Sequence, residues 1–372
     1  MIMLNGLLVA ALAATFTGDA ETPPPVLTER TIAFTADTIY RGDGTSIEKG
    51  TILVKDGVII QVGSDVKVPE GASVIAHEGI ISAGLIALHS NEGAGAELND
   101  STRTVMPNAE ARFALDAQHG DFKRAIASGI TAIVLAPSAE NLVGGYTAVV
   151  KTHGGRVVKP TAQLMLGMSS EALNSNKFPT SYAGALGELR RLFKEPEGPI
   201  ARAVGGSVPV LMKVGTRSEI LRAASFAKEF SLTGSLYGSY WAEDVASEVK
   251  ESGLDVICSP FDVGEGARGV RSVVALAKAG VRVGFGLDAP SRHPESLRFG
   301  AALCVRGGLS PDAARKALTG DAAAIAGVSG RIGRVARGLD ADLVLWSADP
   351  TSLTASVEAV YIDGKLVYGG AR

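Results

Sequence analysis

The stretch Gly79-Ile-Ile-Ser-Ala-Gly-Leu-Ile-Ala-Leu-His-Ser-Asn91 decides the fold of this chain. Its apolar run ends abruptly in His89 and Asn91, which alternate onto one face of an extended strand. A continuous apolar run is typical of a parallel strand that is buried on both faces. Since (β/α)₈ barrels carry their chemistry at the carboxyl ends of such strands, this stretch predicts a buried strand that opens into a functional site.

The region from residue 80 to residue 327 alternates strand-like and helix-like runs, which favours an α/β fold with a parallel sheet. Its length, roughly 250 residues, is usual for one (β/α)₈ TIM barrel. Apolar periodicity predicts helices at Ser218–Phe230, Ala242–Glu251 and Val270–Lys278. The run Thr147–Lys151 fits either a barrel strand or a hairpin excursion. The candidate strands are Leu85–His89, Ile130–Ala136, Thr147–Lys151, Gln163–Gly167, Val208–Gly215, Thr233–Tyr237, Val256–Ser259 and Val281–Gly286.

Short β runs occur near both ends of the chain, and each end contains an Asp-Gly pair that favours a tight hairpin turn. These pairs are Asp56-Gly57 and Asp363-Gly364. The two ends are therefore predicted to build one composite β-sandwich domain from residues 25–79 and 328–372, beside a barrel of residues 80–327.

The N-terminus has the features of an export signal. The apolar run from Leu7 to Phe16 is too short to span a bilayer and is followed by polar residues and three prolines. No Lys or Arg precedes the run, which is unusual for such a signal. We expect residues 1–24 to be a signal peptide and linker, and the protein to be exported to the periplasm or cell envelope with no integral membrane segment after signal removal.

Composition narrows the class of protein. The 36 Lys and Arg nearly balance the 39 Asp and Glu, giving a net charge of −3 without any block of like charges. This balance gives no long-range attraction to nucleic acid or anionic lipid, so no nucleic-acid partner is expected, and a small-molecule ligand is possible. The two cysteines, Cys258 and Cys304, are too few for a disulfide framework and are expected to be core thiols.

Five segments together carry a resemblance to a known family. They are the His89 strand, Ser128–Pro137, Gly144–Lys151, Gly286-Leu-Asp-Ala-Pro290 and the tail Arg331–Leu345. In this order they resemble the amidohydrolase superfamily, closest to its imidazolonepropionase-like branch, which has exported members. The resemblance implies a barrel with a composite domain and hydrolysis of a carbon–nitrogen bond in a cyclic amide or peptide-like substrate, using a divalent metal, normally zinc.

The resemblance also implies which positions would bind the metal. His89 matches the first histidine and Asp288 the aspartate that ends the last barrel strand and transfers the proton in an active member. The other ligand positions fall on Asn91, Met168, Gly215 with its neighbours, and Tyr237. Because catalytic zinc usually has three protein ligands, the binuclear site is predicted to be lost. The expected pocket residues are His89, Asn91, Met168, Gly215 and Tyr237.

Lys213 suggests what could replace the metal charge. Strand alternation turns it toward the site, and we predict that its ammonium pairs with Asp288. The alternative is a Lys213 side chain that points outward toward a helix. For His89, the alternative to ligand binding is a hydrogen-bonded histidine without a metal.

Three functions follow as hypotheses. The first is a pseudoenzyme that binds a small molecule without metal or other cofactor. The second is an active hydrolase with a reduced zinc site at His89 and Asp288. The third is a structural interaction protein of the envelope. The glycine run Gly264–Gly269 also matches a dinucleotide fingerprint, but we interpret it as a loop of the barrel. The acidic residues Glu92, Glu97, Asp100 and Glu110 are expected to lie on a solvated lid rather than around a cation.

Overall fold

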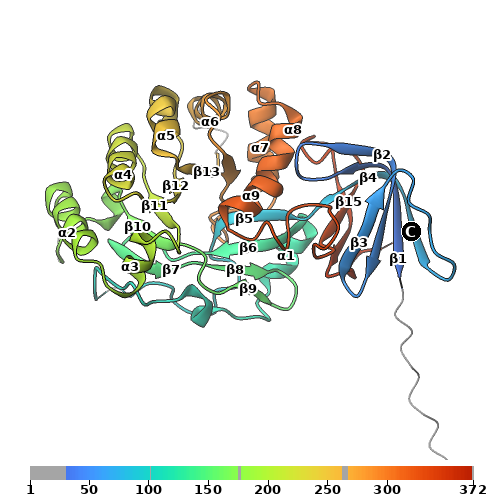
Figure 1. Ribbon diagram of the computed structural model, residues 1–372, viewed down its shortest axis with the longest axis horizontal. Coiled ribbons are helices and arrows are strands. Elements are labelled where there is room, and N and C mark those ends of the chain that lie inside the picture. The colour runs from blue at the N-terminus through green and yellow to red at the C-terminus, as the bar shows by residue number, and fades with distance from the viewer. Residues whose placement is uncertain (1–30, 101, 175–176, 262–266, 371–372) are drawn as a thin grey trace, which may run out of the picture.

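The computed structural model describes residues 31–370, apart from residue 101 and the segments 175–176 and 262–266 (Figure 1). The predicted signal peptide and linker, residues 1–24, lie outside the described residues. Within the described part of the chain, no helix is both long and apolar enough to cross a membrane.

Both ends of the chain enter one seven-stranded sheet, with strand order β17-β16-β15-β4-β1-β2-β3. The hairpins β2–β3 and β16–β17 turn at the predicted Asp-Gly pairs, where all four residues have positive φ, between 52° and 79°. The N-terminal and C-terminal parts join where β4 pairs with β15 in antiparallel fashion. The strands are β1 (Ile32–Tyr40), β2 (Ser46–Lys55), β3 (Val58–Gly63), β4 (Ser73–Ala83), β15 (Leu343–Trp346), β16 (Val357–Ile362) and β17 (Lys365–Gly369).

This sheet curves around its own apolar core. At the β3 side, the N–H of Ile59 donates to Leu339 O and the N–H of Ala341 donates to Gly57 O, so the segment before β15 closes against the β2–β3 hairpin. The core includes Phe34 and Leu343. The described strands of the expected sandwich therefore form a single wrapped sheet.

The strands between the two ends form a six-stranded and a four-stranded sheet. Strands β10 to β14 run parallel to one another, and β5 runs parallel to β6. Strand β8 runs antiparallel to β6 and pairs with β9, so the run Thr147–Lys151 is the hairpin excursion rather than a barrel strand. The strands are β5 (Leu85–Ser90), β6 (Ile130–Leu135), β7 (Val143–Tyr146), β8 (Ala148–Lys151), β9 (Val157–Lys159), β10 (Leu164–Gly167), β11 (Val210–Lys213), β12 (Gly234–Tyr237), β13 (Asp255–Cys258) and β14 (Val283–Phe285).

Backbone hydrogen bonds connect these two sheets at both of their borders. On one side the N–H of Leu287, just after β14, donates to His89 O of β5 at 2.9 Å. On the other side the N–H of Thr147 donates to Gln163 O at 2.9 Å. This central region is thus a mixed α/β fold, in which the described strands form two connected sheets.

Helices cover the strands on one side, where Figure 1 shows α2 and α4 to α8 as a row beside the six-stranded sheet. Helix α4 begins at a capping box, in which Thr216 and Glu219 satisfy each other's backbone N–H groups. The helices are α1 (Asp121–Ala127), α2 (Tyr182–Lys194), α3 (Gly198–Val204), α4 (Arg217–Glu229), α5 (Ala246–Ser252), α6 (Arg268–Lys278), α7 (Ser296–Arg306), α8 (Pro311–Leu318) and α9 (Gly320–Ile325), with short 3₁₀ turns η1 (Ala111–Ala114), η2 (Ser170–Ala172) and η3 (Ala242–Val245).

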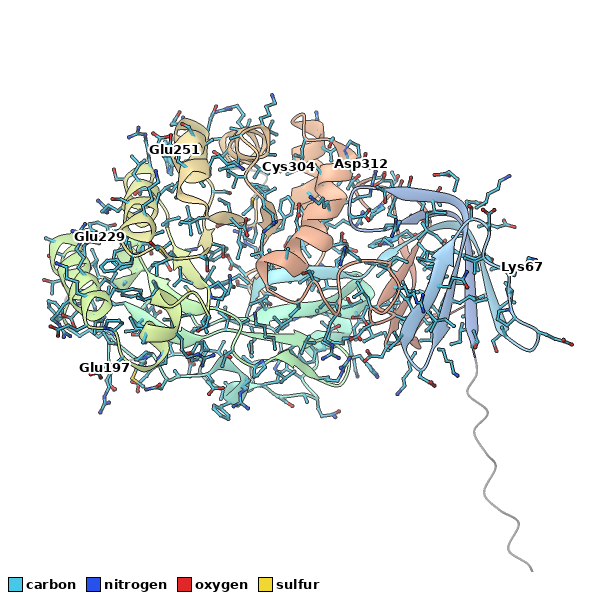
Figure 2. The ribbon with its side chains drawn as sticks, viewed as in Figure 1. Lys67, Glu197, Glu229, Glu251, Cys304 and Asp312 are labelled. Atoms are coloured by element: carbon cyan, nitrogen blue, oxygen red, sulfur yellow. The ribbon has the colours of Figure 1, made fainter. Side chains whose placement is uncertain are left out.

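Both cysteines are buried and free, as the sequence predicts for core thiols. Burial raises the pKa of the Cys258 thiol to about 12 and that of Cys304 further still. Figure 2 shows Cys304 among packed side chains, whereas Glu251 lies at the periphery of the helical row. These thiols are therefore part of the packing and have little thiolate character.

A buried lysine joins the seven-stranded sheet to the four-stranded one. Lys151 at the end of β8 is fully buried, and its ammonium lies 2.8 Å from Asp340, 2.8 Å from Asp342 and 2.6 Å from Asp363. Arg156 also contacts Asp340 and Asp363. The three carboxylates flank β15 and β16, so one cation fixes the position of the C-terminal strands against β8.

Replacing Lys151 with methionine should destabilise the protein by about 3 kcal/mol, because Asp342 would stay buried without its cation. Urea unfolding followed by circular dichroism measures the loss. The matched control is Lys123→Met, at an exposed lysine on α1, which should change the free energy of unfolding by less than about 0.5 kcal/mol. Equal stability of the two variants would show that the buried network contributes nothing net.

Candidate functional site

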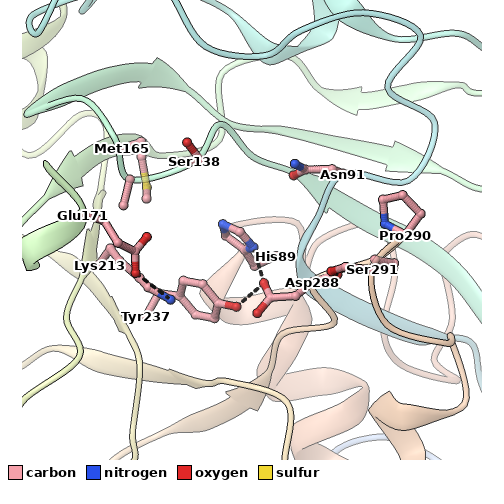
Figure 3. Close-up of a pocket in the computed structure, with 12 residues that line it drawn as sticks. His89, Asn91, Ser138, Met165, Glu171, Lys213, Tyr237, Asp288, Pro290 and Ser291 are labelled. Atoms are coloured by element: carbon pink, nitrogen blue, oxygen red, sulfur yellow. Dashed lines mark hydrogen bonds and ion pairs between the residues drawn. The ribbon is translucent and has the colours of Figure 1, made fainter. Parts of the chain in front are cut away.

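A pocket with a cavity volume of about 690 Å³ opens at the carboxyl ends of the parallel strands (Figure 3). His89 reaches it from β5, Lys213 from β11 and Tyr237 from β12, while Asp288 follows β14. The carboxyl ends of parallel strands meet at one edge, which explains why residues so distant in sequence converge. The lining residues are His89, Asn91, Ser138, Ala139, Met165, Glu171, Lys213, Tyr237, Asp288, Ala289, Pro290 and Ser291.

Asp288 is held by two donors. Its Oδ1 lies 2.9 Å from Nδ1 of His89 and also accepts a hydrogen bond from the hydroxyl of Tyr237. Burial would raise the pKa of Asp288, but the hydrogen bond and charge of His89, followed by the Tyr237 hydrogen bond and the charge of Lys213, hold it below its ordinary value. An ionised carboxylate accepts only, so we assign the Nδ1 proton to His89, which leaves Nε2 as the acceptor in the neutral ring. Figure 3 shows that nitrogen pointing away from Asp288.

The ring of Tyr237 fixes two other groups of the site. The imidazole of His89 stacks on it, with centroids 4.1 Å apart and planes inclined by 18°. The ammonium of Lys213 lies 4.0 Å from the same ring centroid, in cation–π geometry. Tyr237 is only 1% exposed, and its burial followed by the nearby Asp288 charge raises its pKa well above the ordinary value. The phenol therefore stays protonated and remains a donor to Asp288.

The structure corrects the predicted pair between Lys213 and Asp288. Lys213 does turn toward the pocket, because it follows the inward-facing Leu211 by two residues along β11. Its carboxylate partner is Glu171 of η2 at 3.9 Å rather than Asp288. The positive charge of Lys213 still contributes to the low pKa of Asp288.

The other predicted pocket residues divide into two groups. Asn91 lines the pocket, and in the orientation that satisfies its amide it donates to Ala136 O at 2.9 Å and to Ser90 O at 3.2 Å. Met168 and Gly215 are not among the lining residues. Met168 borders a separate small cavity, and the N–H of Gly215 donates to Glu219 at 2.6 Å. Both predictions were wrong.

Several lining residues were not predicted from the sequence. On β10 the inward face carries Met165, because Leu164 and Leu166 pack in the outer core and Met165 in the inner one. Strand alternation along β10 could have identified Met165, because it must face the opposite way from Leu164 and Leu166. Glu171 lies on a short 3₁₀ turn and Ser138 in a loop, and neither has a periodic pattern that predicts its direction.

The donor set of this pocket does not fit the metal centre that the resemblance implies. Among the described residues, no group of three or more His, Cys, Asp or Glu is placed to hold a metal ion. His89 and Tyr237 both use Asp288 Oδ1, so the carboxylate oxygen nearest the pocket histidine is already bound by protein donors. Catalytic zinc generally needs three protein ligands, and the lining offers one imidazole, the engaged carboxylate of Asp288 and the carboxylate of Glu171, which lies beside the ammonium of Lys213 instead of joining the other two.

Comparisons with known proteins agree with this fold. Residues 233–367 match the Amidohydrolase family. The chain is 24% identical to the amidohydrolase tasK of Hapsidospora irregularis over an alignment of 396 residues, which covers 85% of this chain and 39% of that protein. The chain thus spans about two fifths of the length of that curated relative.

Two solved structures are similar over nearly the whole chain. An amidohydrolase from Thermotoga maritima MSB8 has a TM-score of 0.81 and 24% identity, covering 91% of this chain and 100% of that one. A Xaa-Pro dipeptidase with bound methionine in its active site has a TM-score of 0.59 and 14% identity, with coverage of 91% and 100%. The chain therefore has the fold of the amidohydrolase superfamily, and its residues 233–367 carry the sequence pattern of the Amidohydrolase family.

The predicted acidic lid is not uniformly solvated, because Glu92 is completely buried. Neither of its carboxyl oxygens has a hydrogen-bond partner among the described residues. Burial, together with the negative charge of Asp121 and against the charge of Arg124, raises the pKa of Glu92 to about 7. Glu110 forms an ion pair with Arg112, and Asp100 accepts a hydrogen bond from Thr102. These acidic residues therefore have different partners and do not share one.

Replacing Glu92 with glutamine should remove a pH dependence of stability. Between pH 4.5 and about 7 the unfolded chain loses this proton while the folded chain keeps it, so stability falls as pH rises through that window and is level above it. The full loss is about 3 kcal/mol. Urea unfolding at pH 5 and pH 8 should show Glu92→Gln equal to the wild type at the lower pH and more stable at the higher one.

The exposed Glu97→Gln variant, from the same loop, is the control and should follow the wild type at both pH values. If Glu92→Gln also matches the wild type at both pH values, ionisation of the buried Glu92 carboxyl does not lower the free energy of unfolding, and the prediction is wrong.

Proposed function

We propose that this protein binds a small molecule in the pocket around Asp288 and that it lacks the binuclear metal hydrolysis of the superfamily. One observation carries the proposal. The ionised carboxylate of Asp288 is neutralised from within the protein, by the N–H of His89 and the O–H of Tyr237, so it does not need a metal ion to be stable. The volume of about 690 Å³ is within the range of small-molecule sites.

The proposal includes a finer description of the fold. We take the two connected sheets as a (β/α)₈-type barrel in which the β7 and β8 strands interrupt the parallel series. Two backbone hydrogen bonds between the sheets support that arrangement: the N–H of Leu287 to His89 O, and the N–H of Thr147 to Gln163 O. Membership of the imidazolonepropionase-like branch and export through residues 1–24 are parts of the same proposal, supported by the sequence pattern.

A second candidate is an active hydrolase with a reduced zinc site at His89 and Asp288. It is favoured by the distance of 2.9 Å between these side chains and by the Nε2 nitrogen of His89, which remains as an acceptor. In that case Asp288 would hold the imidazole in the tautomer whose unprotonated Nε2 can bind a metal. An interaction role in the cell envelope, the third hypothesis, has no contact in the described structure that favours it over these two.

Elemental analysis of protein purified without chelator tests the metal part of the proposal. The wild type and Asp288→Ala should both contain far less than one equivalent of zinc, because the described residues bring no group of three His, Cys, Asp or Glu together to hold it. About one or two equivalents in the wild type, lost in Asp288→Ala, would instead establish the second candidate.

A thermal-shift screen of small organic molecules tests the binding part. Compounds that raise the melting temperature of the wild type should lose their effect on Ser138→Trp, whose indole fills the pocket. They should keep it on Ser247→Trp, at an exposed position on α5. Compounds that stabilise both tryptophan variants equally would place binding elsewhere and contradict the proposal.

A further inference from the structure

The charges in the pocket are unevenly satisfied. Asp288 is compensated by two short-range donors, as described above. Lys213 differs, because no hydrogen-bond acceptor for its ammonium is found among the described residues. Its contacts are the face of the Tyr237 ring and the carboxylate of Glu171 at 3.9 Å. An ammonium has three donors, and at 3.9 Å an N–O pair is too long to be a hydrogen bond.

Lys213 is nevertheless held in one place. Its backbone belongs to β11, between β10 and β12, and its side chain is only 17% exposed. The cation–π contact with the buried Tyr237 fixes the ammonium at the pocket wall. Of the described lining residues, Lys213 alone carries a permanent positive charge. The pocket therefore presents a positioned cation with unused donors.

Glu171 is a weak partner for this cation. It lies on the three-residue turn η2, and its side chain is 52% exposed. An exposed ion pair of this length contributes little to stability, because solvent screens it. A carboxylate that approaches Lys213 to about 2.8 Å forms a charge-assisted hydrogen bond, which is considerably stronger. Glu171 can swing into solvent without leaving a buried charge behind, so another carboxylate can take its place.

The rest of the pocket limits what can carry that carboxylate. Met165, Ala139 and Pro290 supply apolar wall, and Ser138 and Asn91 supply polar groups. Figure 3 shows Met165 beside Ser138, with Pro290 on the same side as Asn91. A cationic ligand would meet the ammonium of Lys213 while Asp288 is already neutralised. A doubly charged phosphate ordinarily requires several donors, and this wall offers one ammonium.

We propose, on the basis of the binding function above, that the pocket selects small organic monocarboxylates and that Glu171 is an internal competitor for the same lysine. The ligand carboxylate pairs with Lys213 in place of Glu171, and its apolar body packs on Met165 and Pro290. Glu171 thereby sets the affinity: it weakens every anionic ligand by occupying the cation when the pocket is empty.

Isothermal titration of the full chain with 3-phenylpropanoate and with its neutral counterpart 3-phenylpropanamide tests the inference. The acid should bind at least tenfold more tightly than the amide. Lys213→Met should abolish that difference, whereas Lys228→Met, at an exposed lysine on α4 that pairs with Glu251, should preserve it. A melting temperature of Lys213→Met within a few degrees of the wild type will show that this variant is folded. Glu171→Gln changes an exposed side chain and so tests the inference without altering the lysine.

Glu171→Gln gives the most specific outcome, because removing the competitor should raise the affinity for the acid about threefold or more and leave the amide unchanged. Weaker binding of the acid to Glu171→Gln would show that Glu171 supports the ligand and would overturn the inference. Equal affinity of acid and amide for the wild type would also overturn it, while the binding function would stand. Failure of both probes, together with no response in the thermal-shift screen, would overturn the binding function itself.

Discussion

The arrangement of the whole molecule depends on one buried ammonium. Lys151 ends strand β8, in the middle of the chain, and contacts three aspartates that flank the C-terminal strands. A lysine with no solvent exposure is stable only with such partners, and the carboxylate of Asp342 is stable only with the lysine. The contact therefore requires that the wrapped sheet and the parallel strands be correctly assembled at the same time. The pocket, which lies at the ends of those parallel strands, inherits its geometry from that assembly.

The charged groups of the pocket have different kinds of partners from those of the Lys151 network. At the Lys151 network opposite charges meet directly, whereas in the pocket His89 and Tyr237 donate to the acid Asp288 and the ring of Tyr237 contacts the cation Lys213. The imidazole and the phenol neutralise the acid, and the face of the phenol ring supports the cation. Tyr237 thus takes part in both interactions.

The sequence predicted the elements that rest on local patterns. The Asp-Gly hairpins, the helix beginning near Arg217 and the meeting of both ends in one β structure follow from turn chemistry and periodicity, whereas the convergence of His89, Tyr237 and Asp288 was implied by the family resemblance. The errors came where direction is set by a single residue. Met168 was placed by the family's ligand position, whereas the pocket is lined by Met165, and the partner of Lys213 depended on η2, a turn without periodic signal. Burial of Glu92 in a loop rich in polar residues was invisible for the same reason.

The order of synthesis gives the shared sheet a further significance. Strand β4 pairs with β15, and about 260 residues separate Ala83 from Leu343. At ~5–20 residues per second a ribosome needs on the order of 10–60 s to make that interval. During this time the β4 edge that awaits β15 has no native partner, and an unpaired strand edge is a template for association with other chains. The edge of β4 therefore stays open to association with other chains until β15 has been synthesised and has paired with it.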